Sequence, residues 1–467
     1  MSYKAFAVLL QAALRSIPFL TPQGTELIRS FWGVSLRAWY LMIKHLIEES
    51  IALLWMFVKR EPVTGEVVVA KLLQMPKEFN DASSDDSELV PEIMRVGDAL
   101  CKCYLPAYAY FRHPHMKTEE IPASDKLSSG LWVWSSDEAI KSKDVVVLYY
   151  IHGGGYCFFD GVTSHLELVT NMVETLQTRL RSDGWSNVVV VGYIINYDPA
   201  PEKILPTQLQ EVVNGYEFLL SQNRFPVRSD RIVIGGDSAG GSLSLGLLKC
   251  LADNDFCHDL PRPACCLALD PCVDFSFAVA RKGYDISHDI LSNSMIWYCA
   301  CVLYGRPSHP GERLDTMNHP LESDSYVQKA GSFNDKEWVR VREMAPDHRM
   351  EKHPLFSVAY GEVNPGAFGN VPILLQVGGS EALRGDIEHF AAGEAKKGLC
   401  YEVYDHMFHV FPMFSIVVPL GQTAITRWAD FASKALEGEK LPLGKSYAIS
   451  RDRVESFQET APMAQAA

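Results

Sequence analysis

The sequence predicts an α/β protein whose central sheet is mostly parallel and flanked by helices. Three observations support this class. Near-continuous apolar runs of strand length, such as 145–151 and 188–195, recur along the chain, as expected of strands buried on both faces. Helical patterns separate these runs, and such alternation indicates βαβ units. The run 231–234 also leads through a glycine-rich turn into a helical pattern over 242–250.

The composition is that of a globular protein with a sizeable core. Of the 467 residues, 47% are hydrophobic and 21% are charged, which are ordinary fractions. With a net charge of −14 and no basic stripe to neutralise phosphates, we expect no nucleic-acid partner. The 11 cysteines include no C-x-x-C pair, which favours a reducing compartment. We therefore expect a cytoplasmic protein or one at the surface of an intracellular membrane.

The N-terminal segment 1–62 is expected to be a helical cap or a membrane-surface segment. The apolar stretch 35–58 is about as long as a membrane span, but four charged residues interrupt it and would be expensive to bury in a bilayer. These residues are Arg37, Lys44, Glu48 and Glu49. We favour a cap over an apolar site, and peripheral membrane contact through residues 1–60 is the alternative.

The remaining chain divides into a core, an insertion and a tail. The alternating pattern predicts an α/β core over 63–274 and 366–440. The irregular stretch 275–365 is long for a connection, so we expect it to form a second part of the cap. The polar segment 441–467 is expected to be a C-terminal tail. The expected strands are 65–73, 130–134, 145–151, 188–195, 231–234, 265–269, 371–377 and 399–404, and the expected helices are 164–181, 205–222, 242–250 and 421–436.

The glycine-rich turn contains the only G-x-S-x-G motif of the chain, Gly236 to Gly240, with Ser238 at its centre. A strand, a sharp turn with serine at its apex and then a helix form the context of a nucleophile elbow. The apex places the hydroxyl at a helix N-terminus, where N–H groups favour developing negative charge. A turn that merely needs a small polar residue is the alternative.

A serine nucleophile needs a base and an orienting acid, and both have candidates after later strands. His409 follows the last expected strand of the core, with His406 as its competitor. Glu381 is the first carboxylate after the strand 371–377, and Asp386 is the alternative acid. The order serine, acid, histidine is that of hydrolases with this elbow. Glu381 could instead simply cap a helix.

The segment His152-Gly-Gly-Gly155 is a candidate oxyanion hole after the strand 145–151. Glycine N–H groups can approach an anionic oxygen closely, and we expect Gly153 and Gly154 to point theirs inward. The N–H of Ala239, next to the nucleophile, would be the third donor. A glycine-rich loop can also bind phosphate, but the lysine of a P-loop is absent. We expect no metal and no organic cofactor.

Several motifs together resemble the hormone-sensitive-lipase-like branch of the α/β-hydrolases. That group has H-G-G-G, Y-x-x-A-P-E and G-D-S-A-G segments in this order, and the chain has all three, the second over 197–202. The segment 407–411 resembles the M-x-H-x-F histidine motif of the family. The segment 381–386 resembles the D-x-L-R-D acid motif, with Glu381 where aspartate is usual. The resemblance covers roughly residues 140–435.

The resemblance implies an α/β-hydrolase fold and a serine hydrolase that cleaves a carboxylic ester through an acyl-enzyme, without a cofactor. The substrate would be an apolar ester, an acetyl ester or a lactone. An acyltransferase or lactone-forming enzyme with the same triad, and a small-molecule receptor without activity, are the alternatives. The sequence leaves the oligomeric state open. Five aromatic residues could shape an apolar pocket or be ordinary core, namely Phe31, Trp32, Trp39, Trp297 and Tyr298.

Overall fold

One ten-stranded sheet organises the chain, in the strand order β1-β2-β4-β3-β5-β6-β7-β8-β9-β10. The computed structural model describes residues 34–59, 64–74, 89–135, 144–253, 260–277, 289–303 and 350–457. The strands are β1 Lys117–Ile121, β2 Gly130–Trp134, β3 Val145–Ile151, β4 Val189–Ile195, β5 Ile232–Asp237, β6 Cys265–Leu269, β7 Ile373–Gly378, β8 Leu399–Tyr404, β9 Ser446–Ile449 and β10 Val454–Phe457.

The strands from β4 to β9 along the sheet pair in parallel, and antiparallel strands flank them at both edges. Every residue of β3 to β8 is buried. This burial explains why those strands are continuous apolar runs rather than alternating ones. The α/β class that we predicted from these runs is confirmed.

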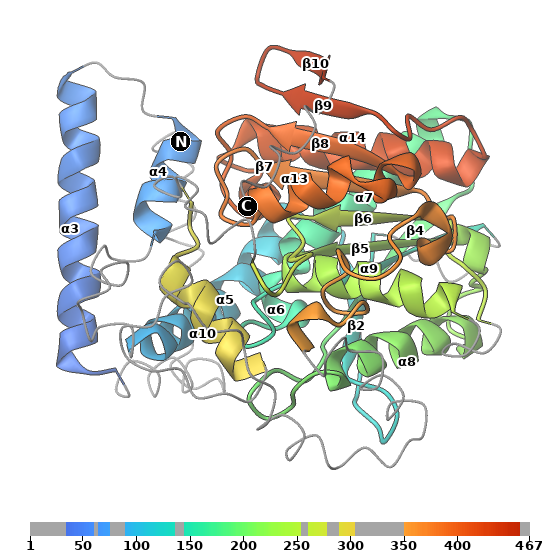
Figure 1. Cartoon of the computed structure of the whole chain (residues 1–467), viewed down its shortest axis with the longest axis horizontal. Coiled ribbons are helices and arrows are strands. Elements are labelled where there is room, and N and C mark those ends of the chain that lie inside the picture. The colour runs from blue at the N-terminus through green and yellow to red at the C-terminus, as the bar shows by residue number, and fades with distance from the viewer. Residues whose placement is uncertain are drawn as a thin grey trace, which may run out of the picture.

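The helices cover both faces of the sheet and its carboxyl edge (Figure 1). They are α3 Leu36–Val58, α4 Gly65–Leu73, α5 Val90–Arg112, α6 Gly161–Ser164, α7 Leu166–Ser182, α8 Thr207–Ser221, α9 Ala239–Ala252, α10 Asn293–Leu303, α13 Arg384–Ala392 and α14 Pro419–Glu437. Short 3-10 turns are η4 Ser229–Arg231, η9 Met350–Lys352, η10 Pro365–Phe368, η11 Glu394–Gly398 and η12 Phe411–Phe414.

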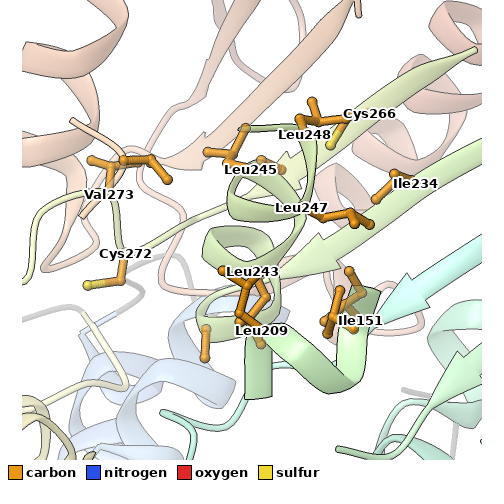
Figure 2. Close-up of a cluster of buried hydrophobic side chains, with 14 of the residues drawn as sticks. Ile151, Leu209, Ile234, Leu243, Leu245, Leu247, Leu248, Cys266, Cys272 and Val273 are labelled. Carbon is orange, nitrogen blue, oxygen red and sulfur yellow. The ribbon is translucent and has the colours of Figure 1, made fainter. Parts of the chain in front are cut away.

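Alternate residues of β3 enter two separate cores, because successive side chains of a strand point to opposite faces. One set packs with α8 and α9, and the other packs with α7 and α14. Figure 2 shows the first core, where Leu243 and Leu247 of α9 lie among Leu209 of α8 and Ile151 and Ile234 of the sheet. Each fully buried side chain of this size contributes about 1.5–3 kcal/mol. The two cores therefore fix the sheet edge on which the site is built.

A helical cap stands beside the carboxyl edge of the sheet. Along it, α3 contacts α4 and α5, and α10 contacts α5. In Figure 1, α3 is the outermost element, and α4, α5 and α10 lie between it and the sheet. None of the helices in the described ranges is both long and apolar enough to cross a membrane.

Three expectations for the ends of the core are wrong. Residues 65–73 form the helix α4 rather than a strand, and Glu66 and Ala70, four residues apart, are its buried positions. Packing in the cap outweighs the β-propensity of the valine run here. The expected core start at residue 63 is wrong for the same reason, since the first described strand begins at Lys117. The segment 441–467, expected to be a tail, contributes β9 and β10 to the sheet.

Candidate active site

Ser238 lies at the turn between β5 and α9, directly before the first residue of the helix. Its backbone has a φ of 51° and a ψ of −120°, a conformation that is strained for a residue with a side chain. Such strain persists only where the surrounding structure fixes it. Here β5 is hydrogen-bonded to β3 and β6 on either side, so the serine is held at the tip of a rigid turn.

The two motif glycines are required by close backbone contacts. A Cβ on Gly236 would lie 2.4 Å from the carbonyl oxygen of Gly240, and a Cβ on Gly240 would lie 2.0 Å from that of Ile151. Neither contact can relax by moving a flexible side chain, because both partners are main chain. The spacing G-x-S-x-G thus follows from how tightly the helix meets the sheet.

His409 and Glu381 come together after β8 and β7. His409 Nδ1 lies 3.1 Å from Glu381 Oε2, and both side chains are buried. The carboxylate in this contact is thus Glu381, whereas the alternative acid, Asp386, lies in the first turn of α13. The competing histidine, His406, has a side chain that is 86% exposed. His409 Nε2 is buried and has no hydrogen-bond partner among the described residues.

Two buried aspartates, which our reading of the sequence did not assign, join the acid loop to the histidine loop. Asp289 accepts hydrogen bonds from the N–H groups of His409 at 2.8 Å and Ala382 at 2.7 Å. Asp270 accepts from those of Gly378 at 2.8 Å and Val410 at 2.7 Å. Each carboxylate therefore bridges the segment beside Glu381 and the segment beside His409. Asp270 directly follows β6, and this position after a strand is the signal by which the sequence could have indicated it.

The acid is held in an environment that disfavours its charge. Burial raises the pKa of Glu381 well above its usual range, and the neighbouring Asp289 raises it further. A backbone hydrogen bond from Leu383 to Glu381 Oε2, at 2.9 Å, acts in the opposite direction. Ionisation of Glu381 is therefore costly in this place, and its Oε2 accepts from Leu383 while it contacts the imidazole of His409.

Asp270, Glu381 and His409 also form a group whose ligand atoms lie within 4.8 Å of one another. Such a group has the chemistry to hold a metal ion. Hydrogen bonds account for its geometry, because Asp270 accepts two backbone N–H groups and Glu381 contacts both His409 and Leu383. The absence of a metal stays a prediction.

The expected role of Gly153 is wrong. Its N–H donates to Asp237 Oδ1 at 3.2 Å, and it is Gly154 and Gly155 that line the cavity. A Cβ on Gly153 would lie 2.2 Å from Asp237 Oδ2, so this glycine packs against the carboxylate. In the described part of the chain, no backbone hydrogen bond takes up the N–H of Gly154 or Gly155. Ala239 begins α9, so its N–H has no acceptor within the helix.

Asp237, the residue before Ser238, supports this glycine loop. Besides Gly153, its Oδ1 accepts from the hydroxyl of Tyr150 at 2.8 Å and lies 3.2 Å from His165 Nε2. Burial would raise the pKa of Asp237, but His165 outweighs it and holds the pKa below its usual value. Burial would likewise lower the pKa of His165, and Asp237 raises it. The two groups thus form a buried ion pair behind the loop.

The Y-x-x-A-P-E segment holds the other side of the same loop. Tyr197 stacks on the ring of His152, with centroids 4.1 Å apart and an interplanar angle of 4°. Its hydroxyl donates to the carbonyl oxygen of His152 at 3.0 Å. The H-G-G-G, Y-x-x-A-P-E and G-D-S-A-G motifs therefore meet at one place. The second contacts the H-G-G-G loop through Tyr197, and the third contacts it through Asp237.

Ser238, His409, Gly154, Gly155 and Ala239 all line one cavity of about 570 Å³. Apolar side chains of α3, α4, α5 and α10 form one part of its wall, and residues of the core and its loops, such as Tyr156 and Phe275, form another. A cavity of this size is typical of small-molecule sites. The polar lining residues, such as Ser238 and His409, lie where the cavity meets the sheet edge. The cap helices line the cavity mainly with apolar side chains.

Of the five aromatic residues proposed for the pocket, the three that the structure describes do not line it. Trp39, Trp297 and Tyr298 are not among the residues that line the cavity, and Trp297 is buried in the core that includes α8 and α9. Phe31 and Trp32 lie outside the described residues. The aromatic walls come instead from Tyr108 and from Tyr156, Phe159, Phe275, Phe277 and Phe414.

Comparison with known proteins gives one family and several relatives. The model of a family described as alpha/beta hydrolase fold matches residues 148–329. An acetyl-hydrolase of Streptomyces hygroscopicus is 26% identical over 285 residues, which are 61% of this chain and 74% of that protein. The arylacetamide deacetylase of Oryctolagus cuniculus is 35% identical over 105 residues, which are 22% of this chain and 24% of that protein.

A solved structure extends the likeness to most of the fold. The hyperthermophilic esterase of the archaeon Pyrobaculum calidifontis superposes with a TM-score of 0.53 at 18% identity. The match covers 79% of this chain and 97% of that one. Since identity is low, this likeness concerns the arrangement of helices and strands.

Proposed function

We propose that this chain, which matches an alpha/beta hydrolase family over residues 148–329 and resembles the hormone-sensitive-lipase-like branch in its motifs, is a serine hydrolase of carboxylic esters, with Ser238, His409 and Glu381 as its triad. Relatives named acetyl-hydrolase, lipase and carboxylesterase support ester hydrolysis as the class of reaction. The observation that carries the mechanism is the 3.1 Å contact between His409 and Glu381 beside the cavity that Ser238 lines.

In the first half of the reaction, His409 Nε2 removes the proton of the Ser238 hydroxyl as its oxygen attacks the ester carbonyl. Glu381 orients the imidazole and stabilises its charge. The N–H groups of Gly154, Gly155 and Ala239 stabilise the oxyanion, and one such donor is worth about 3 kcal/mol in the transition state. His409 then protonates the leaving alcohol, and an acyl-enzyme remains.

In the second half, a water molecule gives its proton to His409 and attacks the acyl-enzyme. The tetrahedral intermediate uses the same oxyanion donors, and its collapse returns the proton from His409 to Ser238 and releases the acid. The apolar walls of the cavity favour a substrate whose acyl or alcohol part is apolar. No metal or organic cofactor takes part in this scheme.

Hydrolysis of p-nitrophenyl butyrate by wild type, Ser238→Ala and Ser244→Ala tests the proposal. Ser244 is a matched control, since its buried hydroxyl only bonds the carbonyl of Gly240 within α9. We expect Ser238→Ala to lower kcat by about 10³-fold or more, and Ser244→Ala to stay within about tenfold of wild type. A Ser238→Ala enzyme as active as the control would overturn the proposed nucleophile.

A further inference from the structure

The helix α3 has a buried face and an apolar face that is exposed. Ala38, Leu41, His45 and Glu49 are buried, and their spacing of three to four residues places them on one side of the helix. Contacts of α3 with α4 and α5 cover that side. This half of α3 is an ordinary cap helix packed on its neighbours.

The opposite side of α3, here called the outer face, carries exposed apolar residues. At about 100° per residue, these positions lie roughly opposite the buried ones. A helix at the surface of a globular protein normally presents polar groups there, because exposed apolar area costs about 25 cal/mol per Å² in water. The outer face consists of Leu36, Tyr40, Ile43, Ile47, Ile51 and Leu54, which are 50–88% exposed.

The outer face is the most remote surface of the cap. In Figure 1, α3 lies at the edge of the molecule, and its neighbours are on the side toward the sheet. A shallow groove of about 390 Å³ runs along the face and is lined by Ile43, Leu46, Ile47, Ser50, Ile51 and Leu54. No charged residue lines this groove. An uninterrupted apolar strip of this kind marks an interaction surface.

The outer face is continuous with the mouth of the cavity. Leu46 lines both the groove and the cavity. Three more exposed residues of the cavity wall, Leu73 of α4, Leu100 of α5 and Ile416, are 36–51% exposed. An apolar ester that reached the outer face would therefore meet apolar side chains from there into the cavity.

We propose that the outer face of α3 docks on the surface of a lipid bilayer, so that apolar esters enter the cavity from the membrane. A bilayer fits better than a protein partner, because a protein seated here would cover the mouth through which the substrate passes. Because the opposite side of α3 stays packed on α4 and α5, the helix lies in the interface with its outer face toward the lipid. The net charge of −14 favours zwitterionic over anionic lipid. Entry of an ester rests on the proposed function, and docking does not.

Flotation of the full chain with phosphatidylcholine vesicles tests the docking. The test variant is Ile47→Asp/Ile51→Asp, whose positions are outside the cavity wall. The matched control is Thr178→Asp/Thr426→Asp, which adds the same charge at exposed positions of α7 and α14. We expect wild type and control to float with the vesicles and the test variant to lose at least tenfold in bound fraction. Phosphatidylserine should not increase the binding of wild type.

Two outcomes would overturn the docking. One is no flotation of wild type, and the other is equal flotation of Ile47→Asp/Ile51→Asp. If the outer face instead joins two copies, sedimentation will show a dimer that the test variant splits, with vesicle binding unchanged. If it packs within the chain, the test variant will unfold at a lower temperature and still float. Ile47→Ser/Ile51→Ser, which adds no charge, repeats the comparison should the aspartates prevent folding.

Activity on water-soluble p-nitrophenyl acetate separates this inference from the proposed function. The test variant should hydrolyse that ester like wild type, because its changes are remote from Ser238. Vesicles that float the wild type without any hydrolysis would refute the proposed function and leave the docking intact. Hydrolysis without flotation would refute only the docking.

Discussion

Glu381 stands where the motif that it resembles usually has aspartate, and its Oε2 reaches His409 Nδ1 at 3.1 Å. The loop of Glu381 and the loop of His409 are fastened to each other by the backbone bonds to Asp270 and Asp289. The position of the acid therefore depends on main-chain contacts.

Replacing the acid tests its role against that of the alternative. Glu381→Gln keeps the size of the side chain but loses an acceptor for charged His409, so we expect kcat to fall by about 10³–10⁴-fold. Asp386→Asn should remain within about tenfold of wild type. Both variants are assayed with p-nitrophenyl butyrate after their folding has been checked by circular dichroism. Loss of activity in Asp386→Asn alone would transfer the role of the acid to Asp386.

At the scale of elements, the cap is fastened to the core by an ion-pair cluster between α5 and α7. His113, at the end of α5, lies 2.8 Å from Glu174 and 3.7 Å from Glu167 through its two ring nitrogens. Arg112 lies 3.3 Å from Glu167. Burial would lower the pKa of His113, but the two glutamates raise it to about 9. The helix α5, which lines the cavity, is therefore held to α7 by His113, and this imidazole loses its proton in mildly alkaline solution.

Alkaline pH should loosen this fastening. Because the folded pKa of His113 lies above the value of about 6.5 for an unfolded histidine, its contribution is complete below pH 6.5 and is lost as pH rises through 9. After allowance for solvent screening, we expect His113→Gln to lower Tm by about 1–3 °C at pH 7 and to match wild type near pH 10. The exposed His115→Gln is the control. Calorimetry that finds the same difference at both pH values would contradict this account.

Elements were predictable from the sequence where local pattern and burial agree. Both faces of the sheet are covered, so the strands β3 to β8 are continuous apolar runs. Such runs can be recognised in the sequence without the structure. The helix α4 was missed because Val67, Val68 and Val69 have strand propensity, whereas the helix is stabilised by its tertiary packing, including the contact of Glu66 with Arg451. Arg451 lies 385 residues from Glu66 in the sequence, so no local sequence pattern could indicate this contact.

At the scale of the whole molecule, the candidate site could be predicted only where motifs carry it. Ser238, His409 and Glu381 each follow a strand of one parallel sheet, so their meeting at one edge follows from the order of the elements. The direction of the Gly153 N–H depends on the Asp237 carboxylate, and the part played by Asp289 depends on loops 93 and 120 residues away. Contacts of this kind are set by the folded structure.

The cap explains how an apolar cavity lies over the carboxyl edge of the sheet. Polar groups gather where strands end, and the cap encloses them with apolar helices. Its outermost helix turns an apolar face outward, which is unfavourable in water and favourable at a bilayer. The cavity thus extends from Ser238 at the sheet edge to Leu46 of α3 in the cap.

The central claim is that Ser238 is the nucleophile of an ester hydrolase, and peptide mass spectrometry after reaction with a fluorophosphonate tests it most directly. We predict one phosphonyl adduct per chain, on the peptide that contains Ser238, and none in Ser238→Ala. Glu381→Gln should label more slowly at the same residue. An adduct on another residue, or labelling that persists in Ser238→Ala, would contradict the account.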